Sequence, residues 1–222
     1  MKLHISLWLL VISAFAMLLS ACSEDNEEIS ATEYANWTFR NDSAFSARLN
    51  EAKTAIAQAK QTYGTAWEAN CPYRILVNYQ KISATPINQS DSIPVYINTT
   101  GGGSGCPLYS DSVRVNYYGR LIPTEHYPDG FVFGFSGSSS KEADVFDKDL
   151  CSPALFSVKG NTTGFATALM YMHIGDVWTI SVHPDLAYGE TATSSIPAHS
   201  MLTFKMELKA FYRPGARDYN WK

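Results

Sequence analysis

The sequence predicts an α+β fold, with an antiparallel sheet that follows a long N-terminal helix. Near the C-terminus, residues 177–182 and 202–208 alternate apolar with polar side chains, the period-two pattern of strands with one buried face. Residues 45–63 instead repeat apolar side chains at steps of four and three, the pattern of an amphipathic helix. We expect the two C-terminal runs to be strands of one antiparallel sheet.

The N-terminus has the pattern of a lipoprotein signal. Lys2 precedes an apolar run at positions 5–19, shorter than the about 20 residues that a membrane-spanning helix needs. Residues 19–22, Leu-Ser-Ala-Cys, resemble a bacterial lipobox, in which small residues precede a cysteine that becomes acylated. We therefore predict a signal peptide over 1–21, lipidation of Cys22 and a lipid anchor in a membrane.

Residues 22–40 are polar and predict a tether. Ser23, rather than an aspartate, follows the predicted lipidated cysteine, so retention at an inner membrane is not indicated. The acidic residues at 24–28 resemble the surface-export signals of Bacteroidota lipoproteins. The predicted location is extracytoplasmic, as an outer-membrane lipoprotein on the periplasmic or the cell-surface face.

The predicted helix begins after Asn-Asp-Ser at 41–43, residue types that favour N-caps, and ends at Gly64. Its apolar stripe consists of Phe45, Leu49, Ala52, Ile56, Ala59 and Tyr63. Two interpretations are open: the stripe packs against the chain's own domain, or it pairs with a second copy to form a homodimer. We favour the first, because a stripe of this length is more often an intramolecular packing face.

Two further strands are predicted at 73–79 and 93–97. Pro94 cannot donate a ladder hydrogen bond, so the second strand is expected at the edge of the sheet or to begin at this residue. The glycine-rich residues 100–105 predict a flexible turn. They are not a phosphate-binding loop, because no Lys-Ser/Thr pair ends them and no helix follows.

Charge and cysteine content exclude several classes of protein. The net charge is −4 and no basic run occurs, so a nucleic-acid surface is not indicated. Beyond Cys22 stand Cys71, Cys106 and Cys151; two of them could pair in an oxidising compartment, and three free, buried thiols are the open alternative. No Cys-x-x-Cys spacing and no histidine ligand pattern occurs, so we predict no metal site, no redox chemistry and no cofactor.

An ordered set of short motifs fills the C-terminal half. They are Met-x-x-Gly-Asp at 172–176, Ala-Tyr-Gly at 187–189, Ile-Pro-Ala at 196–198 and Leu-Thr-Phe-Lys-Met-Glu-Leu at 202–208. In this order they resemble FKBP-type peptidyl-prolyl cis-trans isomerases, and the resemblance extends over about residues 93–211. It implies an FKBP-like half-barrel, a strongly bent antiparallel sheet wrapped around a short helix, here preceded by the extra N-terminal helix.

The resemblance also divides the chain and marks departures from the family. The segments are an N-terminal helical extension with a strand over 41–90, the FKBP-like domain over 91–213 and a tail over 214–222. Residues 137–152 are a polar insertion, predicted to be a mobile loop. Gly134 stands where the family has an aspartate, and Thr162 where it has an isoleucine.

Isomerisation of an X-Pro bond needs no nucleophile or metal. The barrier of about 18–20 kcal/mol comes from amide resonance, which is lost at the twisted transition state, so an apolar pocket that excludes water favours the twisted form. By resemblance, Tyr117, Phe133, Phe165 and Tyr188 are the catalytic residues, and Phe156, Thr162, Ile196 and Phe204 bind substrate. Phe165 is the floor, the other phenylalanines and Tyr117 are walls, Tyr188 donates a hydrogen bond to the substrate carbonyl, Ile196 covers the mouth, and the amide of Thr162 contacts the peptide backbone.

We therefore expect an FKBP-type isomerase that assists the folding of extracytoplasmic, proline-containing polypeptides, with activity reduced by the changes at Gly134 and Thr162. Those same changes favour the alternative of a non-catalytic peptide-binding or chaperone lipoprotein with a degenerate pocket. A third hypothesis is a structural accessory lipoprotein of an outer-membrane assembly, suggested by the insertion and the N-terminal helix.

Overall fold

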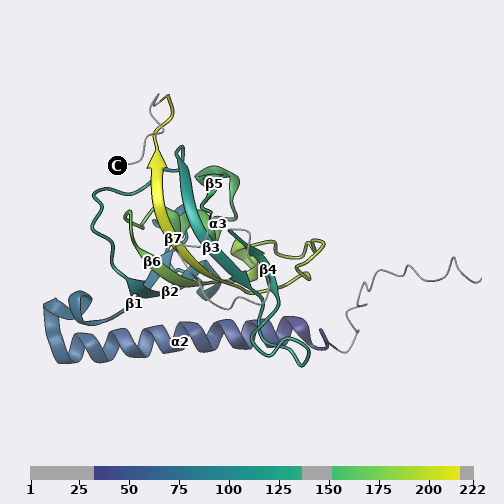
Figure 1. Cartoon of the computed structure of the whole chain (residues 1–222). Helices are drawn as coiled ribbons and strands as arrows, with labels where there is room; N and C mark the ends of the chain where they lie inside the picture. Colours follow the sequence, from purple (N-terminus) through teal and green to yellow (C-terminus); the bar gives the residue numbers. More distant parts are fainter. Residues whose placement is uncertain (1–32, 137–151, 216–222) are drawn as a thin grey trace, which may run out of the picture. The chain divides into compact units, whose positions relative to one another are not determined.

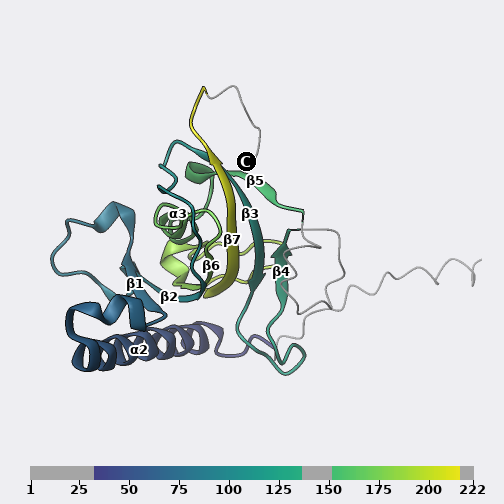
Figure 2. The same ribbon diagram turned by 60° about the vertical axis from the view of Figure 1, so that its left-hand side comes forward.

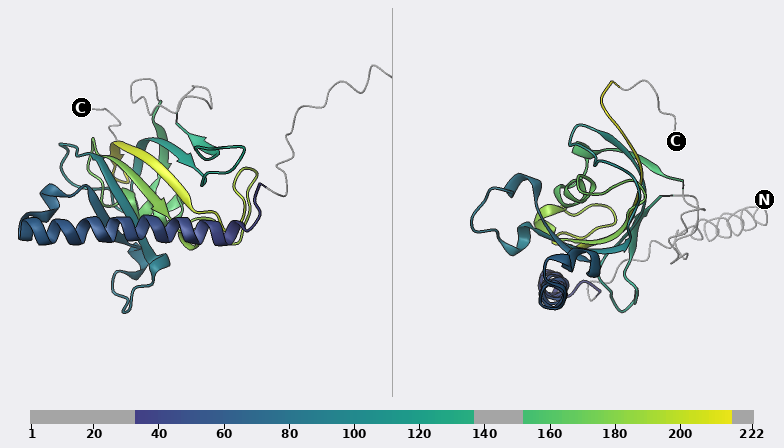
Figure 3. Two further views of the ribbon diagram at one scale, coloured as in Figure 1. Left: turned by 90° about the horizontal axis from the view of Figure 1, so that it is seen from below. Right: turned by 90° about the vertical axis from the view of Figure 1, so that its left-hand side faces the viewer.

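A bent antiparallel sheet wraps around one short helix, and a long helix lies along its outer face (Figure 1 and Figure 3). The computed structural model describes residues 33–136 and 152–215. The predicted signal peptide, the lipidation site Cys22, the third cysteine Cys151, most of the tether and of the tail, and nearly all of the insertion lie outside the described residues. Residues 33 and 34 fall in a separate unit from the chain that begins at Ala35.

The described elements follow one another from the long helix to the last strand. The helices are α2 (Trp37–Tyr63) and α3 (Thr163–Leu169), with the short 3-10 helices η1 (Gly64–Asn70), η2 (Tyr79–Lys81), η3 (Gln89–Asp91), η4 (Val158–Gly160) and η5 (Pro184–Leu186). The strands are β1 (Tyr73–Val77), β2 (Ser92–Thr99), β3 (Ser112–Arg120), β4 (Val132–Phe135), β5 (Ala154–Ser157), β6 (Val177–Val182) and β7 (Leu202–Tyr212). In the described sheet the strand order is β1-β2-β6-β7-β3-β4, and β5 pairs with β3.

The two C-terminal strands confirm the predicted antiparallel pair. Trp178 lies opposite Met206 and Ile180 opposite Phe204, so the apolar positions of β6 and β7 share one face of the sheet. On its other edge β7 runs beside β3 over most of its length (Figure 2). These long central strands carry the apolar face against which α3 packs.

Helix α3 lies in the concave side of the sheet (Figure 3). All of its residues from Gly164 to Leu169 are buried. A Cβ at Gly164 would lie 2.4 Å from Cγ1 of Val182, so only glycine lets the helix approach the sheet this closely. The predicted half-barrel around a short helix is therefore confirmed.

Helix α2 begins at Trp37, four residues before the first residue of the predicted N-cap run at 41–43. It ends at the C-cap Gly64, as expected. Asn41, predicted to stand at the helix N-terminus, is a buried residue of the first turns. Its side chain donates to the carbonyl of Trp37 at 2.8 Å and accepts the backbone N–H of Met201 at 2.7 Å. Trp37 donates from its indole to Ser200 at 2.9 Å. These contacts extend the helix and fasten it to the segment before β7.

The apolar stripe of α2 packs against its own sheet, the first of the two interpretations. Phe45, Leu49, Ala52 and Ala59 are buried, and the helix contacts β1, β2 and β6. Tyr63 at the end of the stripe is 49% exposed. Among the described residues, no helix has the length and apolar content that a membrane crossing requires.

The prediction that strand 93–97 lies at the edge of the sheet or begins at Pro94 is wrong. Strand β2 begins at Ser92 and pairs with both β1 and β6. The ladder with β6 starts only at Val95, one residue after Pro94, so the missing N–H of the proline interrupts no pair. Strand β1 forms the edge instead.

Candidate active site

An aromatic pocket of about 350 Å³ opens at the N-terminal end of α3. All eight residues predicted to form the site line it: Tyr117, Phe133, Phe156, Thr162, Phe165, Tyr188, Ile196 and Phe204. They come from β3, β4, β5, α3, β7 and the long loop between β6 and β7. The structure thus brings together residues that are distant in sequence, and their roles are taken up as proposals below.

The floor and walls of the aromatic pocket are rings packed edge to face. Phe165, 4% exposed, contacts Phe204 at a centroid distance of 5.0 Å and Phe156 at 6.0 Å. Phe133 contacts Phe204 at 5.4 Å, and Tyr117 contacts Phe156 at 5.5 Å. Because each ring edge points at a neighbouring face, the cluster has favourable quadrupole geometry as well as buried area, which restricts ring motion.

The loop between β6 and β7 places Tyr188 and Ile196 at the mouth. Backbone hydrogen bonds from Gly189 to Pro184, from His199 to Gly189 and from Thr193 to Ile196 close the loop on itself, at 2.7–2.9 Å. Ile196 is buried, whereas Tyr188 remains 44% exposed. A large side chain carrying a hydroxyl is therefore held at the rim of the pocket without being part of the core.

Gly134 on β4 pairs with Gly119 on β3, and the side chain of Tyr117, two residues earlier on β3, lies beside it. A Cβ at Gly134 would lie 3.4 Å from the Tyr117 hydroxyl oxygen, so a side chain at this position would meet that hydroxyl. Burial, and to a lesser extent the nearby Tyr188, raises the pKa of the Tyr117 hydroxyl above its ordinary value. The hydroxyl therefore stays protonated and can donate a hydrogen bond well above neutral pH.

Thr162 is the residue before the first turn of α3. Its carbonyl accepts from Ala166 at 2.9 Å, its side chain makes no capping hydrogen bond, and among the described residues no acceptor takes its backbone N–H. A free backbone donor at the rim of an apolar pocket can bind a peptide carbonyl.

The remaining lining residues are Gly134, Gly160, Asn161, Thr193 and Ser195. Gly160, Asn161, Thr193 and Ser195 were not predicted from the sequence as site residues. Asn161 fixes the turn before α3 by donating to the carbonyl of Ser157 at 2.7 Å. The adjacency of Asn161 to Thr162, and of Thr193 and Ser195 to Ile196, was the available signal.

The chemistry available in the aromatic pocket is limited by its residue types. Among the residues that the structure describes, no Asp, Glu, Lys, Arg, His or Cys lines it. Elsewhere in the described chain, no three His, Cys, Asp or Glu side chains are grouped so that they could hold a metal ion, and Cys71 and Cys106 are free thiols. The pocket can hold an apolar ring, exclude water and donate hydrogen bonds to a carbonyl.

Comparisons with known proteins concern the same segment. Residues 107–209 match the family model described as FKBP-type peptidyl-prolyl cis-trans isomerase. The FKBP-type 22 kDa peptidyl-prolyl cis-trans isomerase of Escherichia coli K12 is 34% identical over 123 residues, which cover 55% of this chain and 52% of that protein. The peptidyl-prolyl cis-trans isomerase Mip of Coxiella burnetii is 38% identical over 108 residues, covering 48% and 40%.

The chain thus spans about half the length of these curated relatives. Among solved structures, FkpA from Escherichia coli aligns with a TM-score of 0.47 and 22% identity, covering 92% of this chain and 81% of that one.

Proposed function

Residues 107–209 belong to the FKBP-type peptidyl-prolyl cis-trans isomerase family, and on that premise we propose that the chain catalyses the cis-trans isomerisation of X-Pro bonds in polypeptides. The observation that carries the proposal is the convergence of the eight residues that the resemblance predicted on one aromatic-lined pocket, whose described lining carries no charged side chain. A pocket of about 350 Å³ is large enough for a proline ring and its flanking atoms.

The proposed mechanism is differential binding of the twisted amide. The planar X-Pro amide is polar and well solvated, whereas the twisted form has lost its resonance and its carbonyl is less polar. The ring of Phe165 supports the pyrrolidine, and the walls exclude water. Only interactions that are stronger in the twisted state lower the barrier, and each 1.36 kcal/mol of such difference is about tenfold in rate.

Two donors orient the substrate in this proposal. The hydroxyl of Tyr188 donates to the carbonyl of the residue before proline, and the backbone N–H of Thr162 donates to a carbonyl further along the peptide. Tyr188 suits the role because it is held at the rim and 44% exposed, so substrate reaches it without displacing core residues.

A protease-coupled assay on a short X-Pro peptide tests the proposal, with Tyr188→Phe as the variant. The substitution removes one hydroxyl and leaves the ring, so kcat/KM is expected to fall about tenfold, the value of one hydrogen bond in a site that excludes water. Circular dichroism and thermal unfolding should be unchanged. Absence of turnover in the wild-type chain, or identical rates in both proteins, would overturn the proposed function.

A second candidate function is a non-catalytic peptide-binding or chaperone module. It is favoured by Gly134, which leaves the Tyr117 hydroxyl without a facing side chain, and by Thr162, which brings a hydroxyl to an apolar rim. The same two residues motivate our proposal that activity is lower than in members with aspartate and isoleucine there. Suppression of aggregation of an unfolded protein without any turnover would support the module.

The cellular setting is also a proposal. We propose that the chain is an extracytoplasmic, outer-membrane lipoprotein anchored through Cys22, which metabolic labelling with palmitate and a Cys22→Ser variant would test. Because α2 packs its stripe against its own sheet, a homodimer through this helix would have to use its outer face, where Phe39 is 74% exposed. Light scattering of wild type and Phe39→Glu would distinguish a dimer from a monomer.

A further inference from the structure

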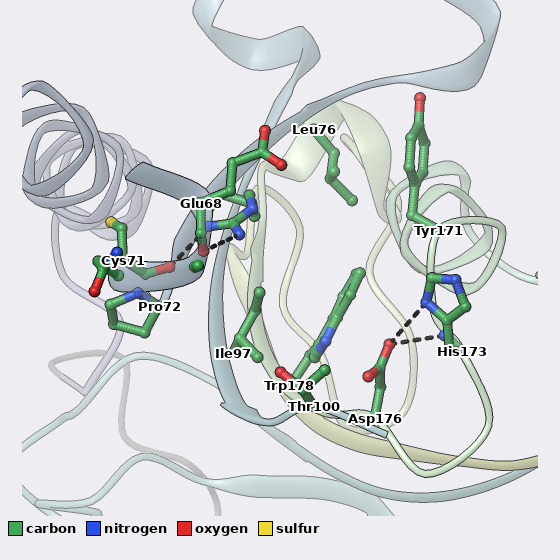
Figure 4. A pocket seen from close by; sticks show the side chains of 13 residues that line it. Glu68, Cys71, Pro72, Leu76, Ile97, Thr100, Tyr171, His173, Asp176 and Trp178 are labelled. Carbon is green, nitrogen blue, oxygen red and sulfur yellow. Dashed lines mark hydrogen bonds and ion pairs between the residues drawn. The ribbon is translucent and has the colours of Figure 1, made fainter. Parts of the chain in front are cut away.

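A second hollow, of about 850 Å³, lies beyond the C-terminal end of α3 (Figure 4). One side consists of Leu76, Ile97 and Trp178 from the adjacent strands β1, β2 and β6. Tyr171 and His173, from the turn that follows α3, stand on the opposite side (Figure 4). We call this space the β1 hollow.

The β1 hollow exists because the sheet is wider than the helix that fills it. Helix α3 has seven residues, and the N-terminal extension adds β1 beyond β2. Helix α3 contacts β1 and β6, yet Leu76, Ile97 and Trp178 still line a hollow beyond its C-terminal end. A concave apolar surface of this size is the usual form of a ligand site.

Two charged groups of the β1 hollow, Arg74 and Asp176, are already engaged. The guanidinium of Arg74 donates to the carbonyls of Cys71, Tyr73 and Glu68 at 2.7–2.8 Å. The carboxylate of Asp176 accepts the backbone N–H groups of Gly101 and His173, each at 2.7 Å. Neither group has its main hydrogen-bonding capacity free, whereas Glu68, which also lines the hollow, carries a carboxylate that disfavours an anionic ligand.

One buried polar group of the hollow has no hydrogen-bond partner among the described residues. Trp178 is 6% exposed, and its indole N–H, which can only donate, meets no acceptor among the described residues. Buried donors in native proteins are almost always satisfied by protein, water or ligand. The indole nitrogen is itself enclosed by the surrounding side chains, so an acceptor reaches it only when these side chains move apart. A peptide carbonyl beside an apolar side chain has the matching chemistry.

The edge of β1 supplies the second observation. Ile97 donates to the carbonyl of Pro72 at 2.7 Å, so alternate residues of β1, including Arg74 and Leu76, point their backbone groups at β2. The backbone N–H and C=O of Ile75 point the other way, and β1 ends the strand order of the described sheet. Such an edge can pair with an extended peptide.

We propose that the β1 hollow and the edge of β1 bind an extended, apolar segment of an unfolded polypeptide, with a main-chain carbonyl accepting the indole N–H of Trp178. The identification of the ligand as a polypeptide rests on the proposed function, which brings unfolded chains to this protein. The segment needs no proline, because it lies at the other end of α3 from the aromatic pocket.

The test uses the full chain and a fluorescein-labelled, proline-free peptide that alternates valine with serine, followed by anisotropy. Trp178→Phe keeps the aromatic volume and removes only the donor, so the dissociation constant should rise about fivefold. Leu76→Asp places a charge in the hollow and should raise it more than tenfold. Tyr96→Phe, on β2, and Tyr188→Ala, at the aromatic pocket, are the matched controls and should bind as wild type.

Two further results decide between ligand classes. A peptide methylated at alternate backbone nitrogens should bind much more weakly if it pairs with the edge of β1. Equal binding by Trp178→Phe and wild type, or no binding of the peptide by a folded wild-type chain, would overturn the inference; binding of a long-chain fatty acid instead would assign the hollow to lipid. None of these readouts uses turnover, so failure of the isomerase proposal leaves them interpretable.

Discussion

The aromatic pocket at the N-terminal end of α3 has a volume of about 350 Å³, and the β1 hollow beyond its C-terminal end about 850 Å³. Both use the concave face of one sheet. The smaller is walled by rings that contact each other edge to face, whereas the larger combines separate aliphatic, aromatic and charged side chains from both halves of the chain.

This difference in construction suits different tasks. Lowering a rotational barrier requires groups fixed where the twisted amide will be, because loosely held groups bind planar and twisted forms equally well. Holding varied segments of a client chain needs area and a few main-chain partners, and it tolerates variation in the side chain bound. Cavity size alone would assign catalysis to the β1 hollow, whereas we propose that it belongs to the aromatic pocket.

The largest effect should come from Phe165→Ala. Removal of this buried ring deletes the floor of the aromatic pocket and leaves a cavity, so kcat/KM on a short X-Pro peptide should fall about a hundredfold. The free energy of unfolding should decrease by about 3–5 kcal/mol. Affinity of the β1 hollow for the proline-free peptide should be unchanged at a temperature where the variant is folded.

Phe45→Ala is the matched control for stability. Phe45 lies on the buried face of α2, where it is 2% exposed, and it lines neither the aromatic pocket nor the β1 hollow. A similar loss of stability is expected, with kcat/KM within about twofold of wild type. If both variants lost activity equally, the loss would reflect general destabilisation rather than the floor of the pocket.

The two sites also differ in how far the sequence predicts them. Tyr188, Ile196 and Phe204 of the aromatic pocket lie in short local motifs, such as Ala-Tyr-Gly at 187–189, and the order of the motifs implies the fold that assembles the pocket. The β1 hollow has no such motif, because it forms only where the N-terminal extension meets the turn after α3. Trp178 could be predicted from its alternation as a core residue, and its unpaired N–H could not.

The start of α2 was predicted at the wrong residue for the same reason, because a contact between distant parts of the chain decides it. Asn41 is an apt N-cap by residue type, yet its amide bonds to Met201, 160 positions away. Likewise Pro94 indicates an edge strand by its missing N–H alone, and only the register shows that the ladder with β6 begins one residue later. Local preference predicts these elements, and long-range contacts set their boundaries and neighbours.

A smaller effect, in the opposite direction, is expected for Gly134→Asp. The new carboxylate would accept a hydrogen bond from the Tyr117 hydroxyl and order that wall of the aromatic pocket, so kcat/KM should rise about three- to tenfold. The pKa of Tyr117 should increase further. Gly134→Ala adds the Cβ without the acceptor, so an equal gain in that variant would attribute the effect to backbone stiffening.

The smallest effect on catalysis should come from a change of pH. Such a change should alter the stability that the packing of α2 provides while leaving kcat/KM at the aromatic pocket unchanged. The part of the pocket lining that the structure describes contains no Asp, Glu, Lys, Arg, His or Cys, and the pKa of Tyr117 is raised, so kcat/KM should stay level between about pH 6 and 9. His183, in contrast, packs edge-on against Phe45 of α2 at 4.9 Å. Burial lowers the pKa of His183, although Asp185, Asp42 and Asp91 oppose the shift.

The sign for stability follows from that lowered pKa. The unfolded chain takes up a proton on His183 near pH 6.5 while the folded chain resists it, so the contribution is present above that pH and is lost as the pH falls toward the folded value. Thermal unfolding at pH 7.5 and 5.5 should show a larger loss for wild type than for His183→Gln. Because α2 is distant in sequence from the pocket residues and lines none of it, kcat/KM of the folded fraction should not change over the same range. A parallel fall in both quantities would mean that docking of the helix and geometry of the aromatic pocket are coupled.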